Sequence, residues 1–345
     1  MSTEAILRVE KAIQEIKQGK MVIMMDDEDR ENEGDLVYAG TFSTPAMVNF
    51  MAKEARGLIC TPISKKMAIN LDLIPMVSNN VSNYETAFTV SIDSTSASTG
   101  ISAGERDDCI SKLANRLTKS SDFVRPGHIF PLIAKDGGVL VRTGHTEGSV
   151  DLCRLAGLAP VGVICEIIKD DGEMARKNDL EIFAKKHDMM IVYISDIVEY
   201  RLANEQLVKR VKEEEIEIMG MKSMQITYED HIGRIHKAVQ FYKIHPTSNV
   251  KFHNIGLDID LILDQEKFNS LTHSLAYLKQ NGGILVFLDT KTISKEQAKE
   301  FGVGAQILKD LGIENIKLLT SNIETEFVGL SGFGLNVIEK IEIKA

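Results

Sequence analysis

The densest group of chemically reactive side chains in this chain is the run DDEDRENEGD at residues 26–35, in which seven of ten residues are acidic. Carboxylates at this density repel one another, so folding alone gives no reason to gather them. The run follows the short apolar segment 21–25, which predicts a buried strand, and α/β folds collect ligands where strands end. Mg²⁺ takes oxygen ligands, and Arg30 offers a forked donor for an anion. These residues predict a metal-assisted site, and the alternative is a solvated acidic loop.

Four further features carry groups that bind anions or move protons. The segment RTGHTE at 142–147 precedes an expected helix and is either a phosphate site or an ordinary helix cap. The segment RPGH at 125–128 predicts a rigid turn that presents a histidine, either for proton transfer or as a structural residue. Glu166 lies in an apolar run, which is typical of acid–base residues unless the carboxylate is exposed at a sheet edge. The polar stretch 94–104 is either a flexible loop or a second anion site.

Length and composition limit what these segments can belong to. With 345 residues, the chain exceeds the roughly 250–300 residues at which single cores stop growing, so we expect two domains. The net charge of −10 disfavours a nucleic-acid partner. No apolar run approaches the ~18–20 residues that span a bilayer, and the N-terminus does not resemble a signal peptide, so we expect no membrane partner. Four cysteines without a CxxC pair indicate a reduced, cytoplasmic protein.

Apolar periodicity predicts how these segments are positioned. In the first half, helices are expected over 3–18, 45–55, 105–118, 146–157 and 175–187, and strands over 21–25, 58–63, 88–92 and 161–167. This alternation predicts an α+β domain with a three-layer α/β/α architecture and a mixed sheet. The densely charged segment 199–217 predicts an exposed helix leading into a linker or a first strand. We place the domain boundary between residues 205 and 206, and expect a smaller α/β domain over 206–345.

Five motifs in the first half together resemble 3,4-dihydroxy-2-butanone-4-phosphate synthase, which supplies the four-carbon unit of riboflavin. They are DDEDRENEGD at 26–35, STGISAGER at 98–106, RPGHIFPL at 125–132, RTGHTE at 142–147 and DDGEMAR at 170–176. The resemblance covers roughly residues 1–200. It implies a carbon–carbon lyase that converts D-ribulose 5-phosphate to L-3,4-dihydroxybutan-2-one 4-phosphate and formate with Mg²⁺ or Mn²⁺. It also implies a homodimer with active sites near the subunit interface.

The same resemblance implies roles for individual residues. Glu31 and His145 would hold two metal ions per site, and Asp35 and Glu166 would carry protons, with His128 as a further acid–base or positioning group. The residues expected to contact the sugar phosphate are Arg30, Glu31, Asp35, Thr99, Arg142, Thr143, Gly144, His145, Thr146 and Glu166. Ser98 and Glu105 stand where other members often have threonine and aspartate, and both changes preserve the functional group.

Residues 299–341 resemble the C-terminal part of GTP cyclohydrolase II, which is often fused behind the synthase. That enzyme holds zinc through three cysteines in the pattern C-x10-C-x-C. Here the corresponding positions are Gly256, Lys267 and Asn269, and the Gly-Arg-rich phosphate segment is missing. We therefore expect a degenerate domain without zinc that serves stability, oligomerisation or regulation. The alternative is a bifunctional enzyme that also retains GTP cyclohydrolase II activity or an altered activity on a nucleotide.

A binding module is the competing class of function for the whole chain. Its acidic loop would bind a cationic partner, and its second half would be an interaction domain. This hypothesis leaves the accompanying phosphate-binding and proton-transfer residue types unexplained.

Overall fold

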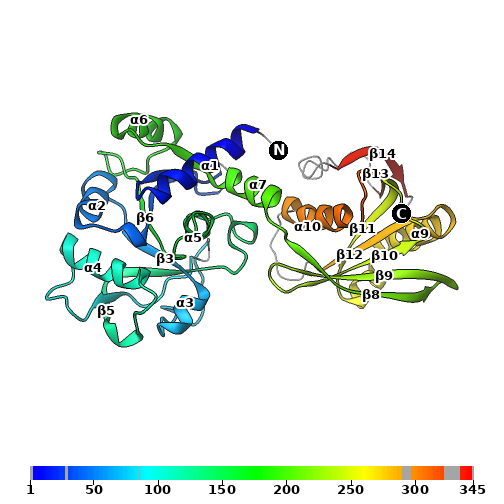
Figure 1. Cartoon of the computed structure of the whole chain (residues 1–345), viewed down its shortest axis with the longest axis horizontal. Coiled ribbons are helices and arrows are strands. Elements are labelled where there is room, and N and C mark those ends of the chain that lie inside the picture. Colours follow the sequence, from blue (N-terminus) through cyan, green and yellow to red (C-terminus); the bar gives the residue numbers. More distant parts are fainter. Residues whose placement is uncertain (1–2, 28–29, 85, 290–296, 322–334, 344–345) are drawn as a thin grey trace. The chain divides into compact units, whose positions relative to one another are not determined.

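The computed structural model describes residues 3–27, 30–84, 86–289, 297–321 and 335–343. The chain divides into two compact units, Ser2–Tyr200 and Arg201–Ala345 (Figure 1). The division falls in helix α7 (Ile194–Asn204), shortly before the boundary that the sequence predicts.

The N-terminal unit contains a mixed sheet with the strand order β4-β5-β3-β6-β2-β1-β7. Its strands are β1 (Val22–Met25), β2 (Gly34–Ala39), β3 (Cys60–Ser64), β4 (Ile92–Ser94), β5 (Phe123–Ala134), β6 (Gly162–Glu166) and β7 (Ile191–Tyr193). The pairs β1–β7 and β3–β5 are parallel, whereas β1–β2, β2–β6 and β4–β5 are antiparallel. The predicted mixed sheet is confirmed.

Helices cover both faces of this sheet because successive residues of a strand point to opposite sides. In β2, Leu36 and Tyr38 join one apolar core, whereas Val37 and Ala39 join the other. The first core includes side chains from α2 (Pro45–Phe50), α3 (Lys65–Asn70), α4 (Ala103–Ala114) and α6 (Lys177–His187). The second includes side chains from α1 (Thr3–Lys17), α5 (His145–Leu155) and α7. The unit thus has the predicted α/β/α layers.

The predicted turn at residues 125–128 is wrong, because these residues lie inside strand β5. Proline and glycine usually interrupt a strand, which is why the sequence favoured a turn. Here Gly127 lets the two backbones come close, since a Cβ on it would lie 2.1 Å from the carbonyl carbon of Ile92 in β4. The β4–β5 pairing shifts register between Ile92 and Asp93, so the strand continues through an irregularity.

The prediction of an exposed helix over 199–217 is also largely wrong. Helix α7 ends at Asn204, and β8 (Val208–Ile218) pairs antiparallel with β9 (Met221–Asp230). Met219 and Gly220 connect these strands with φ values of 51° and 72°. Two consecutive residues in this left-handed region form the hairpin turn that fits twisted strands. Pairing with β9 therefore overrides the helical preference of the charged residues.

The C-terminal unit contains a second sheet, with the strand order β14-β13-β11-β12-β10-β9-β8. Its remaining strands are β10 (Ile235–Phe241), β11 (Thr247–Ile255), β12 (Gly283–Asp289), β13 (Asn315–Thr320) and β14 (Asn336–Glu342), and its helices are α8 (Asp258–Leu263), α9 (Gln265–Asn281) and α10 (Gln297–Asp310). Side chains of α10 and α9 belong to different apolar cores, which contain alternating residues of β12. This is the predicted smaller α/β domain.

Some sequence-based expectations fall outside the described residues. They concern Glu28 and Asp29 of the acidic run and residues 322–334 of the cyclohydrolase-like segment. Among the described residues, no helix combines the length and apolar character that crossing a membrane requires.

Candidate active site

Asp26 shapes the acidic loop that follows β1. Its side chain is buried, and its Oδ1 accepts the Glu33 backbone N–H at 2.8 Å. Its Oδ2 accepts the Glu31 backbone N–H at 3.0 Å and an Arg30 guanidinium N–H at 2.8 Å. A carboxylate that accepts several N–H groups folds the loop back on itself, so the first acid of the run acts as a local brace.

Two residues from distant segments fasten the same loop. The Tyr84 hydroxyl donates to the Arg30 carbonyl at 3.0 Å, and the Arg30 guanidinium lies 5.2 Å from the Tyr84 ring centroid. Arg176 Nη1 donates to the carbonyls of Glu31 at 2.7 Å and Asn32 at 2.6 Å. Sequence reasoning gave none of these three supports, Asp26, Tyr84 and Arg176, its structural role. Asp26 and Arg176 lie at the ends of two of the motifs, DDEDRENEGD and DDGEMAR, whereas Tyr84 belongs to none.

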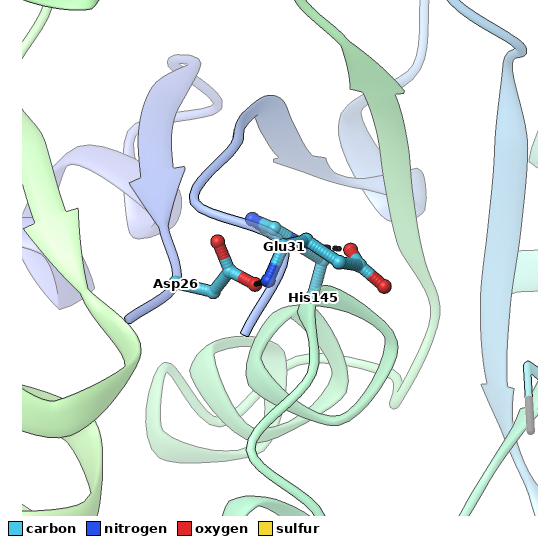
Figure 2. A group of neighbouring side chains, drawn as sticks. All are labelled: Asp26, Glu31 and His145. Atoms are coloured by element: carbon cyan, nitrogen blue, oxygen red, sulfur yellow. Dashed lines mark hydrogen bonds and ion pairs between the residues drawn. The ribbon is translucent and has the colours of Figure 1, made fainter. Parts of the chain in front are cut away.

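Glu31 meets His145, the first residue of α5, beneath this loop. His145 is buried, and its Nε2 lies 3.2 Å from the Met24 carbonyl. A carbonyl only accepts, so Nε2 carries a proton, and the lone pair of the neutral ring lies on Nδ1. That nitrogen faces Glu31 Oε2 at 3.8 Å. Ligand atoms of Asp26, Glu31 and His145 lie within 4.8 Å of one another. Figure 2 shows these three side chains next to one another.

This donor set fits a hard divalent cation. The 3.8 Å between Glu31 Oε2 and His145 Nδ1 is too long for a hydrogen bond, so these two potential ligand atoms face each other without bonding to each other. The contact from Nε2 to the Met24 carbonyl orients the ring, as a hydrogen bond from the other ring nitrogen does in metal-binding histidines. Asp26 already accepts three N–H groups. Glu31 and His145 are therefore the better candidate ligands.

The pKa values of Glu31 and His145 depend on each other's charge, and that of His145 depends also on the carboxyl of Asp35. Burial alone would raise the pKa of Glu31, but the charges of the nearby Arg30 and His145 lower it. Burial would lower the pKa of His145, but the charge of Asp35 and the Glu31 carboxylate raise it to about 9. At neutral pH, His145 without a cation therefore holds a second proton on Nδ1. Cation binding must displace that proton.

Asp35 and Glu166 lie opposite each other on β2 and β6. Burial raises the pKa of Asp35 to about 7; the charge of His145 opposes this effect, and that of Glu166 adds to it. Asp35 Oδ1 is 3.9 Å from His145 Nε2. Glu166 Oε2 accepts the Leu58 backbone N–H at 2.8 Å, which fixes that carboxylate beside β3. Two opposed carboxyls in different environments are the arrangement that acid–base chemistry needs.

Arg142 is largely committed to protein acceptors. Its Nη1 donates to Glu147 Oε2 at 2.5 Å, and its Nε and Nη2 donate to the Tyr84 carbonyl at 3.2 and 2.9 Å. A further bond from Nη2 to Thr86 Oγ1 leaves one of the five guanidinium N–H groups for an external anion. A Cβ on Gly144 would lie 2.3 Å from Arg142 Nη1, so a side chain at this position would displace the guanidinium.

The candidate phosphate residues Thr143, Gly144 and Thr146 surround the start of α5. Gly144 is the N-cap of this helix, and Thr146 is buried in its first turn. The backbone N–H groups at the start of a helix favour an anion. The structure therefore places these three residues next to His145, as the motif implies.

His128 and Thr99 belong to a second group. His128 contacts Asp93 of β4, and Thr99 lies in a loop whose backbone and hydroxyl groups donate to Glu105. None of the hydrogen bonds or ion pairs among the described residues joins this group to Glu31 or His145. The candidate site residues thus fall into two groups.

Comparison with known proteins decides the family. The family model for 3,4-dihydroxy-2-butanone 4-phosphate synthase matches residues 10–200, and that for GTP cyclohydrolase II matches residues 263–342. A 3,4-dihydroxy-2-butanone 4-phosphate synthase of Sulfurospirillum multivorans is 56% identical, with 99% of this chain and 96% of that protein covered. The chain belongs to the 3,4-dihydroxy-2-butanone 4-phosphate synthase family. A riboflavin biosynthesis protein of Bacillus mycoides is 41% identical, with 98% and 93% covered.

Solved structures of synthases extend this result to the fold. A two-domain 3,4-dihydroxy-2-butanone 4-phosphate synthase from A. baumannii has a TM-score of 0.79 and 40% identity, with 98% of this chain and 99% of that chain covered. A synthase in complex with two magnesium ions has a TM-score of 0.53 and 40% identity, with 55% and 94% covered. The predicted family, fold and enzyme class are confirmed: this is an enzyme of riboflavin biosynthesis. The magnesium-bound neighbour supports the use of a divalent metal.

Proposed function

We propose that the N-terminal unit converts D-ribulose 5-phosphate to L-3,4-dihydroxybutan-2-one 4-phosphate and formate. The observation that carries this proposal is the opposition of Asp35 and Glu166 beside the Glu31–His145 pair. The two products together contain all the atoms of the substrate. The reaction therefore needs no oxidant, reductant or second substrate, and the protein has only to move protons, hold oxygens and stabilise negative charge.

The two carboxyls are the proposed proton carriers. Asp35, whose pKa burial raises to about 7, exchanges protons in both directions near neutral pH. Glu166 accepts the Leu58 N–H through Oε2, which leaves Oε1 for the sugar. Together they remove and return protons on the sugar as the ketose enolises, loses a water molecule and takes one up again before formate leaves. His128 is a further acid–base group in this proposal.

Glu31 and His145 are the proposed metal ligands, for two Mg²⁺ or Mn²⁺ ions per site. A bound divalent cation stabilises negative charge on neighbouring oxygens as a Lewis acid. The chain's own contribution is to orient the donors: Met24 fixes the His145 ring, and Asp26 fixes the Glu31 backbone.

The sugar phosphate binds between the acidic loop and the start of α5 in this proposal. Arg30 and the remaining Arg142 N–H attract the anion, and the backbone N–H groups at the helix N-terminus donate to the phosphate oxygens. The proposed phosphate contacts at that terminus are Thr143, Gly144 and Thr146, and Thr99 contacts the sugar from the second group of residues.

Formate release tests this activity directly. The full chain is incubated with D-ribulose 5-phosphate and Mg²⁺, and formate is quantified with and without a chelator. We expect Mg²⁺-dependent formate release that stops in the chelator and returns on addition of excess Mg²⁺. Absence of formate from folded, metal-loaded protein would overturn the proposal.

We propose further that the C-terminal unit has no GTP cyclohydrolase activity and holds no zinc. The positions of the family's zinc cysteines carry other contacts: Lys267 pairs with Asp264 at 2.8 Å, and Asn269 Oδ1 accepts from Gln265 at 2.8 Å. A lysine brings a positive charge where a zinc site needs a thiolate. Stoichiometric zinc by metal analysis, or formate and pyrophosphate from GTP, would instead establish the bifunctional alternative.

We also propose a homodimer in the cytoplasm that binds neither nucleic acid nor membrane. Large apolar side chains are exposed on the N-terminal unit at Ile69 (70%), Ile74 (58%) and Val81 (84%). Exposed apolar groups close together in sequence are typical of a surface that another subunit covers. The four cysteines are free and buried, which suits a reducing compartment. Light scattering at several concentrations tests the dimer, and fractionation of the source cell tests the location.

A further inference from the structure

We infer that Asp93 is the positioning residue of His128: it holds the ring by Nδ1–H and so presents an unprotonated Nε2 to the substrate. This inference rests on the acid–base role proposed for His128. It assigns a role to a strand residue that belongs to none of the five sequence motifs.

The contacts between Asp93 and His128 involve both carboxylate oxygens. Oδ1 accepts the backbone N–H of His128 at 2.8 Å, and Oδ2 lies 2.7 Å from the ring Nδ1. The Asp93 side chain is only 9% exposed. An ionised carboxylate has no proton to donate, so the ring proton in this contact lies on Nδ1. The lone pair of the neutral imidazole is then on Nε2.

A glycine closes over this contact. Gly100 has a φ of +85°, and a Cβ on it would lie 2.0 Å from Asp93 Oδ2 and 2.5 Å from His128 Nδ1. Its loop is held by the Glu105 carboxylate, which accepts the backbone N–H of Thr99 at 3.2 Å and that of Gly100 at 3.1 Å. Only a residue without a side chain fits here, so the backbone covers the Nδ1 side of the ring.

The other side of the ring is open. The His128 side chain is 42% exposed, and its Nε2 has no hydrogen-bond partner among the described residues. One ring nitrogen is therefore fixed and covered, whereas the other is accessible. This asymmetry distinguishes a presented histidine from a structural one, in which both nitrogens are satisfied.

In this arrangement His128 takes a proton from the substrate and later returns it. Nε2 accepts a proton from a substrate hydroxyl or carbon acid, and the electron pair of the broken bond stays on the substrate. The ring becomes an imidazolium that keeps Nδ1–H on Asp93, whose charge stabilises it. Nε2 later returns the proton to the substrate. A buried carboxylate plays the same orienting part towards histidine in serine hydrolases.

The Asp93→Asn variant separates this role from a merely structural one. The His128 backbone N–H still needs an acceptor, so the amide oxygen takes the place of Oδ1 and the amide NH₂ faces Nδ1. A donor at that point forces Nδ1 to accept and moves the ring proton to Nε2. The variant thus keeps the contact between β4 and β5 but reverses the tautomer.

Ser91→Ala is the matched control. Ser91 Oγ accepts the Gly127 backbone N–H at 3.1 Å, next to His128 but without touching its ring. This variant removes a side-chain bond to the same stretch of β5. It reports what loosening that stretch does by itself.

The experiment combines ¹⁵N NMR of the imidazole nitrogens with steady-state kinetics on full-length, Mg²⁺-loaded protein. We expect wild type and Ser91→Ala to show the Nδ1–H tautomer of His128 and Asp93→Asn to show Nε2–H. We expect kcat to fall about 100-fold or more in Asp93→Asn with KM nearly unchanged, since general acid–base catalysis contributes roughly 10²–10⁴. Ser91→Ala should keep most of kcat.

An Nε2–H tautomer of His128 in wild type would overturn the inference, and this measurement does not depend on the folding of any variant. In Asp93→Asn, an unchanged tautomer, or a reversed tautomer with normal kcat, would also overturn it. So would a loss of kcat in Ser91→Ala as large as that in Asp93→Asn. Failure of the proposed function looks different: wild type would release no formate, or His128→Ala would keep full kcat.

Discussion

Each unit of this chain contains a buried histidine among acids, and the two histidines differ in what their nitrogens do. In the N-terminal unit, His145 Nδ1 faces Glu31 at 3.8 Å without a hydrogen bond. In the C-terminal unit, His236 Nδ1 accepts the Asp289 N–H at 3.1 Å, and its Nε2 lies 3.2 Å from Asp230. Nδ1 of the first histidine has no hydrogen-bond partner among the described residues and can bind a cation that displaces its proton, whereas both nitrogens of the second contact neighbouring groups of the fold.

The carboxylates around these histidines differ in the same way. Asp35 is buried near other acids, and its pKa rises to about 7. Burial would also raise the pKa of Asp230, but hydrogen bonds from His236 and Arg234 hold it well below its usual range. A carboxyl suited to proton transfer lacks enough hydrogen bonds and positive charges to stabilise its ionised form, whereas a structural carboxylate has them. Acidic side chains beside a histidine are therefore not enough to define a site.

The largest expected effect comes from Asp35→Asn, next to the proposed metal ligands Glu31 and His145. The amide keeps the shape of the side chain but cannot take up a proton, so kcat should fall by roughly 10²–10⁴. Mg²⁺ binding should persist, because Glu31 and His145 remain. Formate assays and calorimetric titration with Mg²⁺ measure the two quantities. Normal kcat would remove Asp35 from the mechanism.

His236→Ala tests the role of the histidine that contacts Asp230 and Asp289 in the C-terminal unit. It removes a buried donor and acceptor and leaves Asp230 and the Asp289 N–H without these partners, which costs about 1–3 kcal/mol in the free energy of unfolding. Formate release by the folded protein should match that of wild type. Denaturant titration and the formate assay check both parts, and loss of activity without loss of stability would contradict the comparison.

A smaller effect is expected for the pH dependence of stability. Because the folded pKa of Asp230 is depressed, its ionised form stabilises the fold above the unfolded pKa of about 4. That contribution is lost as pH falls through the folded pKa. The stability difference between wild type and Asp230→Asn should therefore shrink on acidification below about pH 4. Thermal melts from pH 7 downwards measure it, and a difference independent of pH would show that the charge of Asp230 contributes nothing.

The sequence was most informative where the chemistry is local. Glu31 sits in an acidic run whose residue types already indicate a metal site, the family resemblance adds His145, and the structure brings the two together. The supports of that site were invisible because they depend on distant contacts: Tyr84 and Arg176 reach the acidic loop from segments far along the chain. Asp93 had no motif, since its role depends on strand pairing.

The two errors in the predicted secondary structure also come from contacts between segments distant in the sequence. Pro126 and Gly127 suggested a turn, but pairing between β4 and β5 holds them in a strand. The charged segment before residue 218 suggested a helix, but the turn at Met219 and Gly220 closes a hairpin. In both places, partners chosen by the tertiary fold outweighed local preference.

Metal binding by matched variants tests the central claim most directly. Mn²⁺ is titrated into full-length wild type, Glu31→Ala, His145→Ala and His236→Ala, and bound Mn²⁺ is followed by electron paramagnetic resonance. We predict that wild type and His236→Ala bind Mn²⁺ alike, and that Glu31→Ala and His145→Ala lose binding together with formate release. Unchanged Mn²⁺ binding in folded His145→Ala would contradict the assignment of the buried Glu31–His145 pair as the metal site.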